Sequence, residues 1–281
     1  MGYEVDFLGT CSESKSGDAI AIRFGNLHGS RDEQTVVVID GGFTDDGTQL
    51  VEHIRTHFGT GRVDLVISTH PDQDHINGLE AVLNELDVDE LWLHQPWEHN
   101  AGLAESFHDG RITDNSIGER LKATLNKAHA LCELAESKGI PVKKPFTGLT
   151  HGSGCVKVLG PTQDYYESLI PEFDGMPATK SEAFVESAFG KAVAAVKRFF
   201  AQWGKDEIND EGVTSAKNNS SVITQVIVDD RRLVFTGDAG IDALHYVADE
   251  IDCCNDPAEL TFVQIPHHGS RRNVGPSVLN R

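Results

Sequence analysis

The stretch His70-Pro71-Asp72-Gln73-Asp74-His75 places four potential metal ligands within six residues. It directly follows the apolar run 63–69, which has the pattern of a buried strand. Burying two imidazoles and two carboxylates together costs several kcal/mol unless a cation neutralises the acids and shares the imidazole lone pairs. The stretch therefore predicts a divalent metal site at the end of a strand.

Composition limits the classes of protein to which the chain can belong. Its 281 residues suffice for one large α/β domain, and its formal net charge of -20 argues against broad wrapping of a nucleic acid by Lys and Arg. No apolar run approaches the roughly 18 to 20 residues of a membrane helix, and residues 1–6 lack a signal-peptide pattern. The five cysteines are an odd number without Cys-x-x-Cys spacing, so no disulfide framework is expected. We expect a cytoplasmic protein without a membrane partner.

Apolar periodicity predicts alternating strands and helices. Helices are expected over about 48–56, 77–86 and 116–138, and residues 171–217 are expected to form an insertion or lid with a helix over 192–203. The run 275–281 has the pattern of the first turn of a helix and stops there, so a fold truncated at its C-terminus is one expectation. Strands are expected over 5–8, 19–24, 36–42, 63–68, 90–94, 156–159, 221–228, 233–238 and 260–265, with a hairpin turn at 229–232.

Four predicted strand ends carry an acid or a histidine beside glycine. An Asp before Gly is by itself more often a turn former than a functional acid. Four such ends at the same place in an α/β chain instead predict one active site. They are Asp40-Gly41-Gly42, the His70 to His75 stretch, Gly237-Asp238-Ala239-Gly240 and His267-His268-Gly269-Ser270.

In this order the motifs resemble the metallo-β-lactamase fold superfamily, and most closely its competence-protein (ComEC-type) metallohydrolase branch. The resemblance covers nearly the whole chain except 171–217. It implies an αββα sandwich and a single hydrolase domain over 1–281. Further matching motifs are Gly17-Asp18-Ala19-Ile20, Val158-Leu159-Gly160-Pro161, Asn218-Asn219-Ser220-Ser221 and Phe235-Thr236-Gly237-Asp238.

The resemblance also implies one or two divalent metal ions and assigns their ligands. One ion would be held by His70 and Asp72, the other by Asp74 and His75, with Asp238 bridging. His268 is expected as the last ligand, and His267 as a proton donor or a residue behind the ligands. Asp40 is expected to orient the ligands. The predicted catalytic residues are Asp74, His267 and Asp40.

Two departures from the family pattern affect this expectation. Most members have His where this chain has Asp72, and the more oxygen-rich site shifts the preference from Zn²⁺ towards Mn²⁺ or Mg²⁺. The ComEC-type branch shares this departure. The His of the family's third motif has no match, because 156–159 run into Gly160-Pro161 and His151 precedes that strand. Occupancy of the first metal position is therefore left open.

The expected reaction is hydrolysis of a phosphodiester or phosphoester by a metal-bound hydroxide, as in a nuclease or phosphodiesterase. The expected partner is an anionic substrate such as a nucleotide, an oligonucleotide or single-stranded DNA; oligomeric state is not indicated. Two alternatives remain: a carbonyl hydrolase acting on an ester, thioester or lactam, and a catalytically weak sensing or scaffold module. Donors for substrate oxygens are expected from Asn219, Ser220, Ser270 and Arg271.

Overall fold

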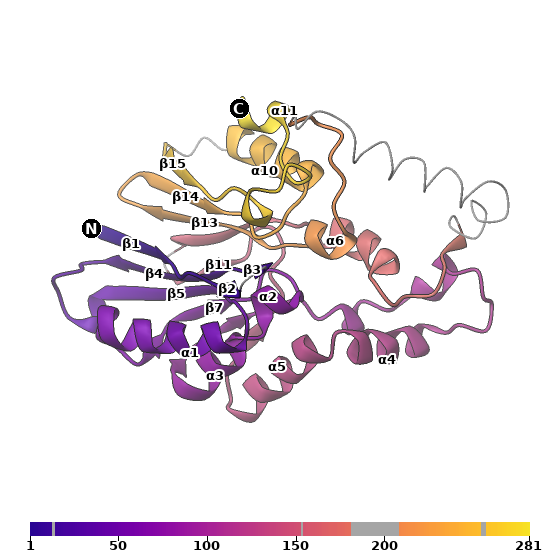
Figure 1. Cartoon of the computed structure of the whole chain (residues 1–281), viewed down its shortest axis with the longest axis horizontal. Coiled ribbons are helices and arrows are strands. Elements are labelled where there is room, and N and C mark those ends of the chain that lie inside the picture. The colour runs from indigo at the N-terminus through magenta and orange to yellow at the C-terminus, as the bar shows by residue number, and fades with distance from the viewer. Residues whose placement is uncertain (13–14, 153, 181–207, 254–256) are drawn as a thin grey trace.

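The first of two facing sheets is built mainly from the N-terminal half of the chain. The computed structural model describes residues 1–12, 15–152, 154–180, 208–253 and 257–281 (Figure 1). The first three strands are antiparallel, and pairing is parallel from β5 onward. In spatial order the strands are β1 (Gly2–Phe7), β4 (Ala19–Gly25), β5 (Gln34–Gly41), β7 (Leu65–Ile67), β9 (Leu91–Trp92) and β10 (Val142–Lys143).

The second sheet comes from the C-terminal half. Its strands β13 and β14 form the hairpin that the sequence predicts. The last strand returns parallel to β14 after helix α10 (Ile241–Cys253). In spatial order the strands are β11 (Thr150–His151), β12 (Val156–Gly160), β13 (Ile223–Val228), β14 (Arg231–Phe235) and β15 (Glu259–Val263). Two small ribbons pair β2 (Cys11–Ser12) with β3 (Lys15–Ser16), and β6 (Arg62–Val63) with β8 (Asp87–Val88).

Three apolar clusters define the layers. The central cluster joins Ile39 and Ile67 of the first sheet to Val226 and Phe235 of the second. A second cluster packs the outer face of the first sheet against α1 (Thr44–His53), α3 (Leu79–Glu85) and α5 (Asn126–Ser137). A third packs the outer face of the second sheet against α10. Figure 1 shows this helix, sheet, sheet, helix order, which confirms the expected α/β fold with an αββα sandwich.

Short helices complete the described part of the chain. Within those residues, no helix has the length and apolar character to cross a membrane. The short α-helices are α2 (Gln73–Ile76), α4 (Asp114–Thr124), α6 (Gln163–Leu169), α9 (Ala216–Asn219) and α11 (Pro276–Leu279). A π-helical turn (Ile54–Phe58) continues α1.

One predicted helix is wrong in its extent. The single helix expected over 116–138 is two helices, α4 and α5, separated at Leu125, whose backbone leaves the helical region (φ -103, ψ 41). The break lets α4 pack on the turn Pro96–Glu98 while α5 packs on α3. The apolar period continues because Leu125 stays buried. The sequence reading missed α6 and α10, and the helix expected at 192–203 lies outside the described residues.

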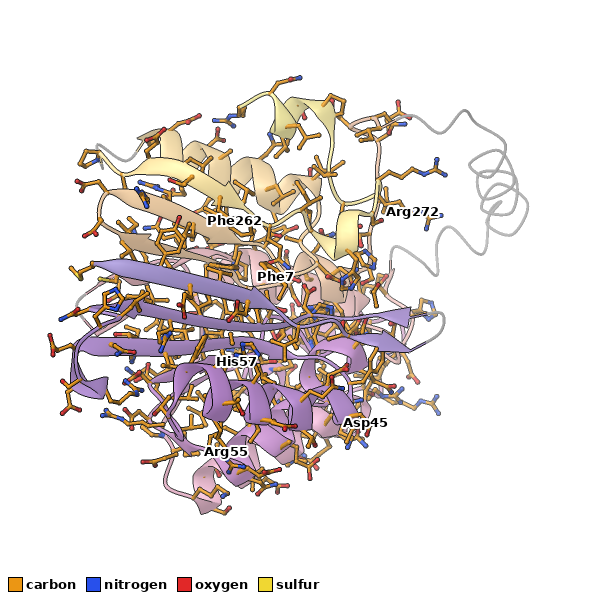
Figure 2. The ribbon with its side chains drawn as sticks, turned by 60° about the vertical axis from the view of Figure 1, so that its left-hand side comes forward. Phe7, Asp45, Arg55, His57, Phe262 and Arg272 are labelled. Atoms are coloured by element: carbon orange, nitrogen blue, oxygen red, sulfur yellow. The ribbon has the colours of Figure 1, made fainter. Side chains whose placement is uncertain are left out.

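The first strand and the last strand of the chain meet where the sheets adjoin. The rings of Phe7 in β1 and Phe262 in β15 have centroids 5.9 Å apart (Figure 2). Just beyond these strands, Gln264 Nε2 donates to Asp18 Oδ2 at 2.7 Å. This contact brings the beginning of β4 next to the turn that follows β15, and so places Asp18 beside the predicted site.

A backbone contact fixes the helices below the site. Gly78, between α2 and α3, lies against the backbone of Gly41 and Gly47, and a Cβ at position 78 would overlap the Gly41 carbonyl oxygen. The Gly78 N–H donates to Gly42 O at 3.0 Å. The close approach holds α2, which carries His75, against the end of β5.

We expect Gly78→Ala to destabilise the fold by about 3 kcal/mol, since a methyl group pressed on backbone cannot be relieved by a rotamer change. Urea unfolding followed by circular dichroism measures the effect. Gly61→Ala is the matched control, because a Cβ at Gly61 meets nothing within 4 Å. Equal unfolding midpoints for the two variants would contradict the proposed constraint.

Candidate metal centre

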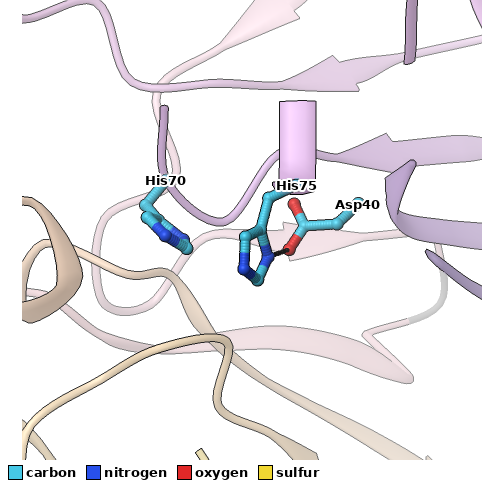
Figure 3. Close-up of side chains that lie close together, drawn as sticks. All are labelled: Asp40, His70 and His75. Atoms are coloured by element: carbon cyan, nitrogen blue, oxygen red, sulfur yellow. Dashed lines mark hydrogen bonds and ion pairs between the residues drawn. The ribbon is translucent and has the colours of Figure 1, made fainter. Parts of the chain in front are cut away.

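Two buried histidines, His70 in the loop after β7 and His75 in α2, each have one ring nitrogen held by a neighbouring group. His75 Nδ1 lies 2.8 Å from Asp40 Oδ2 (Figure 3). His70 Nδ1 lies 3.0 Å from Thr69 Oγ1. The backbone N–H and the hydroxyl of Thr69 both donate to Asp40, at 2.8 and 2.6 Å. In both histidines Nδ1 is engaged, so Nε2 is the atom left to face the centre.

The turn after β15 supplies two more anchored imidazoles. His268 Nδ1 lies 3.3 Å from Asp18 Oδ1, and His267 Nδ1 lies 2.9 Å from the side-chain oxygen of Asn273. Asn273 is fully buried and also donates to the Asp238 carbonyl oxygen at 2.7 Å. A carboxylate or amide that holds Nδ1 fixes the orientation of the ring and directs Nε2 towards a metal.

The free Nε2 atoms lie near carboxylate oxygens in two groups. We call these groups the first and the second position. The first position comprises His70, Asp72, His267 and one oxygen of Asp238. Asp238 Oδ2 lies 3.7 Å from His70 Nε2 and 3.6 Å from His267 Nε2. Asp72 Oδ2 lies 3.8 Å from His70 Nε2. Such separations suit donor atoms arranged around one cation with bonds of about 2.0 to 2.2 Å.

The second position comprises Asp74, His75, His268 and the other oxygen of Asp238. His75 Nε2 lies 3.4 Å from Asp238 Oδ1 and 4.0 Å from Asp74 Oδ2. His268 Nε2 lies 3.9 Å from the same Asp74 oxygen. Asp238 thus presents one oxygen to each position, which is the arrangement that the predicted bridging ligand requires.

Buried atoms without partners indicate that the residues fit divalent cations. His70 Nε2, His75 Nε2 and Asp238 Oδ1 are buried and have no hydrogen-bond partner. Leaving a buried polar atom unpaired is costly. A cation at the first position would pair His70 Nε2, and one at the second position would pair the other two atoms. Potential ligand atoms within 4.8 Å of one another include the set Asp74, His75 and His268.

The pKa values show a surplus of negative charge around two of the rings. Burial lowers the pKa of His70 well below its ordinary value, with the charge of His75 adding to the effect. Burial also disfavours charged His75, but the charge of Asp40 and the neighbouring carboxylate of Asp238 raise its pKa well above the ordinary value. Hydrogen bonds to Asp18 and Asp74 raise the pKa of His268 to about 9. A divalent cation would relieve this surplus of negative charge.

The structure places three further residues relative to the two positions. His267 is not behind His268: its Nε2 is as near to Asp238 as that of His70. His151 lies against Trp92, with ring centroids 6.4 Å apart, and is not part of either position. Asp40 contacts Thr69 and His75 and therefore positions His75 rather than facing the centre.

The predicted substrate-binding residues are only partly at the centre. Asn219 packs against Gly240, and the buried Ser220 hydroxyl donates to the Lys217 carbonyl oxygen at 2.6 Å. Both side chains therefore have neighbours within the protein, and their roles in substrate binding stay predictions. Ser270 and Arg271 follow the His267–Gly269 turn, and Arg271 is exposed. Their roles in substrate binding stay predictions.

Sequence reasoning did not commit to three residues that contact the centre. They are Asp18, Asn273 and Lys217, whose Nζ lies 2.6 Å from Asp72 Oδ1. The motif Gly17-Asp18 indicated Asp18. The run 217–220 before the β13 hairpin weakly indicated Lys217. No sequence signal marked Asn273.

Part of the chain matches a known family. Residues 30–165 match the model described as the Metallo-beta-lactamase superfamily. The matched part includes Asp40 and the His70 to His75 stretch, whereas Asp238, His267 and His268 follow it. The match supports a metallo-β-lactamase fold and a metal-dependent hydrolase. The ComEC-type branch is not distinguished by it and stays a prediction.

The chain is also similar to several solved structures. A Thermotoga maritima protein provisionally named a metallo-beta-lactamase is 11% identical with a TM-score of 0.41, covering 89% of this chain and 90% of that one. A metallo-beta-lactamase from Pontibacter korlensis is 11% identical with a TM-score of 0.40, covering 94% and 86%. One from Hirschia baltica is 9% identical with a TM-score of 0.41, covering 99% and 90%. The comparison with curated proteins found no match.

Replacing Asp40 tests whether the anchored imidazoles prepare a metal site. We expect Asp40→Asn to weaken binding of Zn²⁺ or Mn²⁺ by about 10- to 100-fold, because loss of the carboxylate frees the His75 ring. Isothermal titration calorimetry on metal-stripped protein measures this. Asp87→Asn, at an exposed residue of β8, is the control. Unchanged affinity in the Asp40 variant would mean that His75 needs no such anchor.

A small cavity next to His70 contains another buried histidine. His94 lines it together with Ser68 and Tyr166, and the His94 ring stacks on Tyr166 with centroids 4.1 Å apart. Neither ring nitrogen of His94 has a hydrogen-bond partner. Burial lowers the pKa of His94 to about 3, so the ring is neutral at ordinary pH.

His94 should make folding pH-dependent in acid. Its folded-state pKa of about 3 lies below the ordinary 6.5, so between these values the unfolded chain binds a proton that the folded chain does not. Stability from this residue is complete above about pH 6.5 and is lost as pH falls towards 3, at up to about 1.4 kcal/mol per pH unit. We expect His94→Phe, which keeps the ring stack, to remove this part of the slope.

Urea unfolding at a series of pH values between 7 and 4, with both proteins in a chelator, measures the difference. The free energy of unfolding of the Phe variant should gain on that of the wild type as pH falls. A constant difference between the two proteins across this range would contradict the low pKa of His94.

Proposed function

We propose that the protein is a metal-dependent hydrolase of phosphodiester bonds, acting as a nuclease or phosphodiesterase. The observation that carries the proposal is the convergence of four anchored imidazoles on the carboxylates of Asp72, Asp74 and Asp238. The family match over 30–165 independently supports a metal-dependent hydrolase.

The two positions would hold two divalent cations with Asp238 shared between them. When bound, such a pair supplies Lewis acidity and lowers the pKa of a water molecule towards neutrality. The chain's own part is to hold the ligands in place, because each imidazole is already oriented through its Nδ1 atom. With two imidazoles and two carboxylates each, the positions suit Zn²⁺ or Mn²⁺, and Mg²⁺ less well.

Two features favour a phosphodiester over a carbonyl substrate. By the family resemblance, Asp72 replaces the usual histidine, and carboxylate oxygen suits the harder cations that serve phosphoryl transfer. Lys217 adds a positive charge beside Asp72. The net charge of -20 favours short anionic substrates, such as nucleotides, oligonucleotides or locally held single-stranded DNA, over long duplexes.

Replacing Asp74 separates the proposed enzyme from its alternatives. Metal-stripped wild type should hydrolyse bis(p-nitrophenyl) phosphate and single-stranded DNA once Mn²⁺ or Zn²⁺ is restored. Asp74→Ala should lower turnover by about 100-fold or more, because the second position loses the carboxylate that faces His75 and His268. Initial rates at saturating metal, with metal content from mass spectrometry, measure this.

Asp87→Ala is the matched control, an exposed aspartate of β8. A p-nitrophenyl acetate arm tests the carbonyl alternative. Turnover of the ester but not of the diester would favour a carbonyl hydrolase. Full metal loading without turnover of either substrate would favour the sensing or scaffold alternative and refute the enzyme.

A further inference from the structure

Lys217 is a largely buried lysine whose ammonium group lies at the edge of the first position. It lies in α9, whose first turn is capped by Ser215, which accepts from the Asn218 N–H. The Lys217 side chain is only 18% exposed. Its Nζ lies 2.6 Å from Asp72 Oδ1 and 3.3 Å from Asp174 Oδ2. The ammonium group is therefore held by two carboxylates, which differ in their distance from it and in their exposure to solvent.

The two oxygens of Asp72 face different partners. Oδ1 contacts Lys217, whereas Oδ2 is the oxygen directed at His70 Nε2, 3.8 Å away. One carboxylate can thus serve a metal ligand role through Oδ2 while it keeps its contact with Lys217 through Oδ1. The ammonium group then stays beside the first position when that position is filled.

The second contact of Lys217 is easily given up. Asp174 is 78% exposed, so water can replace the ammonium group as its partner at little cost. An anionic oxygen arriving at the centre could take the place of Asp174 on Lys217. The contact with the less exposed Asp72 would persist, since that carboxylate is 28% exposed.

The ammonium group of Lys217 affects the net charge of the centre. The carboxylates that line or anchor the centre carry five formal negative charges, and two divalent cations would supply only four positive ones. Lys217 supplies the fifth. Without it, an acidic protein of net charge -20 would offer a negative centre to an anionic substrate. The five carboxylates are those of Asp18, Asp40, Asp72, Asp74 and Asp238.

Resting on the proposed phosphodiesterase function, we propose that Lys217 forms an anion subsite beside the first position. It binds a non-bridging oxygen of the substrate phosphate in exchange for Asp174, and it makes the site select anionic esters over neutral ones. Lys217 forms and breaks no covalent bond in this role. Asp174 acts as a competing internal anion.

The test combines binding of inorganic phosphate with steady-state kinetics on metal-loaded protein. Lys217→Met should raise the phosphate Kd and the KM for bis(p-nitrophenyl) phosphate by about 10-fold or more, and should leave the KM for any p-nitrophenyl acetate hydrolysis unchanged. Asp174→Asn should shift both constants in the opposite direction, because it removes the competitor. Lys217→Arg should retain most of the phosphate affinity.

Lys127→Met, at an exposed lysine of α5, is the matched control. Metal content by mass spectrometry accompanies every variant, and Asp174→Asn keeps the test decisive if Lys217→Met fails to fold. Unchanged phosphate Kd in both variants, or loss of metal as the sole effect of Lys217→Met, would overturn the subsite. Lys217-dependent phosphate binding without diester turnover would support the subsite and refute the proposed function.

Discussion

The buried carboxylate of Asp40 is the constraint on which the candidate centre depends. Asp40 is the next-to-last residue of β5, is fully buried, and has a left-handed backbone conformation (φ 57). It accepts two hydrogen bonds from Thr69 at the end of β7 and contacts His75 in α2. A buried carboxylate without such partners would cost several kcal/mol, so the three segments are held in one arrangement. The pairing of β5 with β7 therefore also sets the geometry of the ligand loop.

The same rule of construction applies to all four imidazoles of the centre. Each has Nδ1 engaged by a neighbour and Nε2 directed inward, but the neighbours come from separate parts of the chain: Thr69, Asp40, Asp18 and Asn273. Ordering a free imidazole at the moment of metal binding would cost rotamer entropy. In this fold the imidazoles are already ordered before a metal binds, since their anchors belong to the sheet ends and the turns that follow them. Stability of the sandwich and affinity for metal are therefore linked.

The parts of the site that could be predicted are those in which local sequence determines position. Long apolar runs specified the strands. Parallel pairing of β5 with β7 brings their carboxyl ends together, so the convergence of Asp40 and the His70 to His75 stretch followed. Asp238 follows β14 of the facing sheet, so its approach to them also depends on how the two sheets pack. The contact of Lys217 with Asp72 spans 145 positions and depends on side-chain reach, which no local pattern encodes. The break at Leu125 could not be predicted because the local pattern is misleading there. The apolar period runs through it unchanged, because both helices cover the same core cluster.

The role of two adjacent histidines required a backbone that sequence patterns do not reveal. The family resemblance implied one ligand, His268, with His267 as a proton donor or a residue behind the ligands. His267 and His268 instead both have left-handed backbones (φ 51 and 54), and their rings diverge by 68°. Each such residue costs about 1 kcal/mol or more, and glycine would avoid the cost but would carry no imidazole. The conformation lets one short turn direct His267 at Asp238 and His268 at Asp74. The turn thereby places an imidazole at the first position, where β12 provides none.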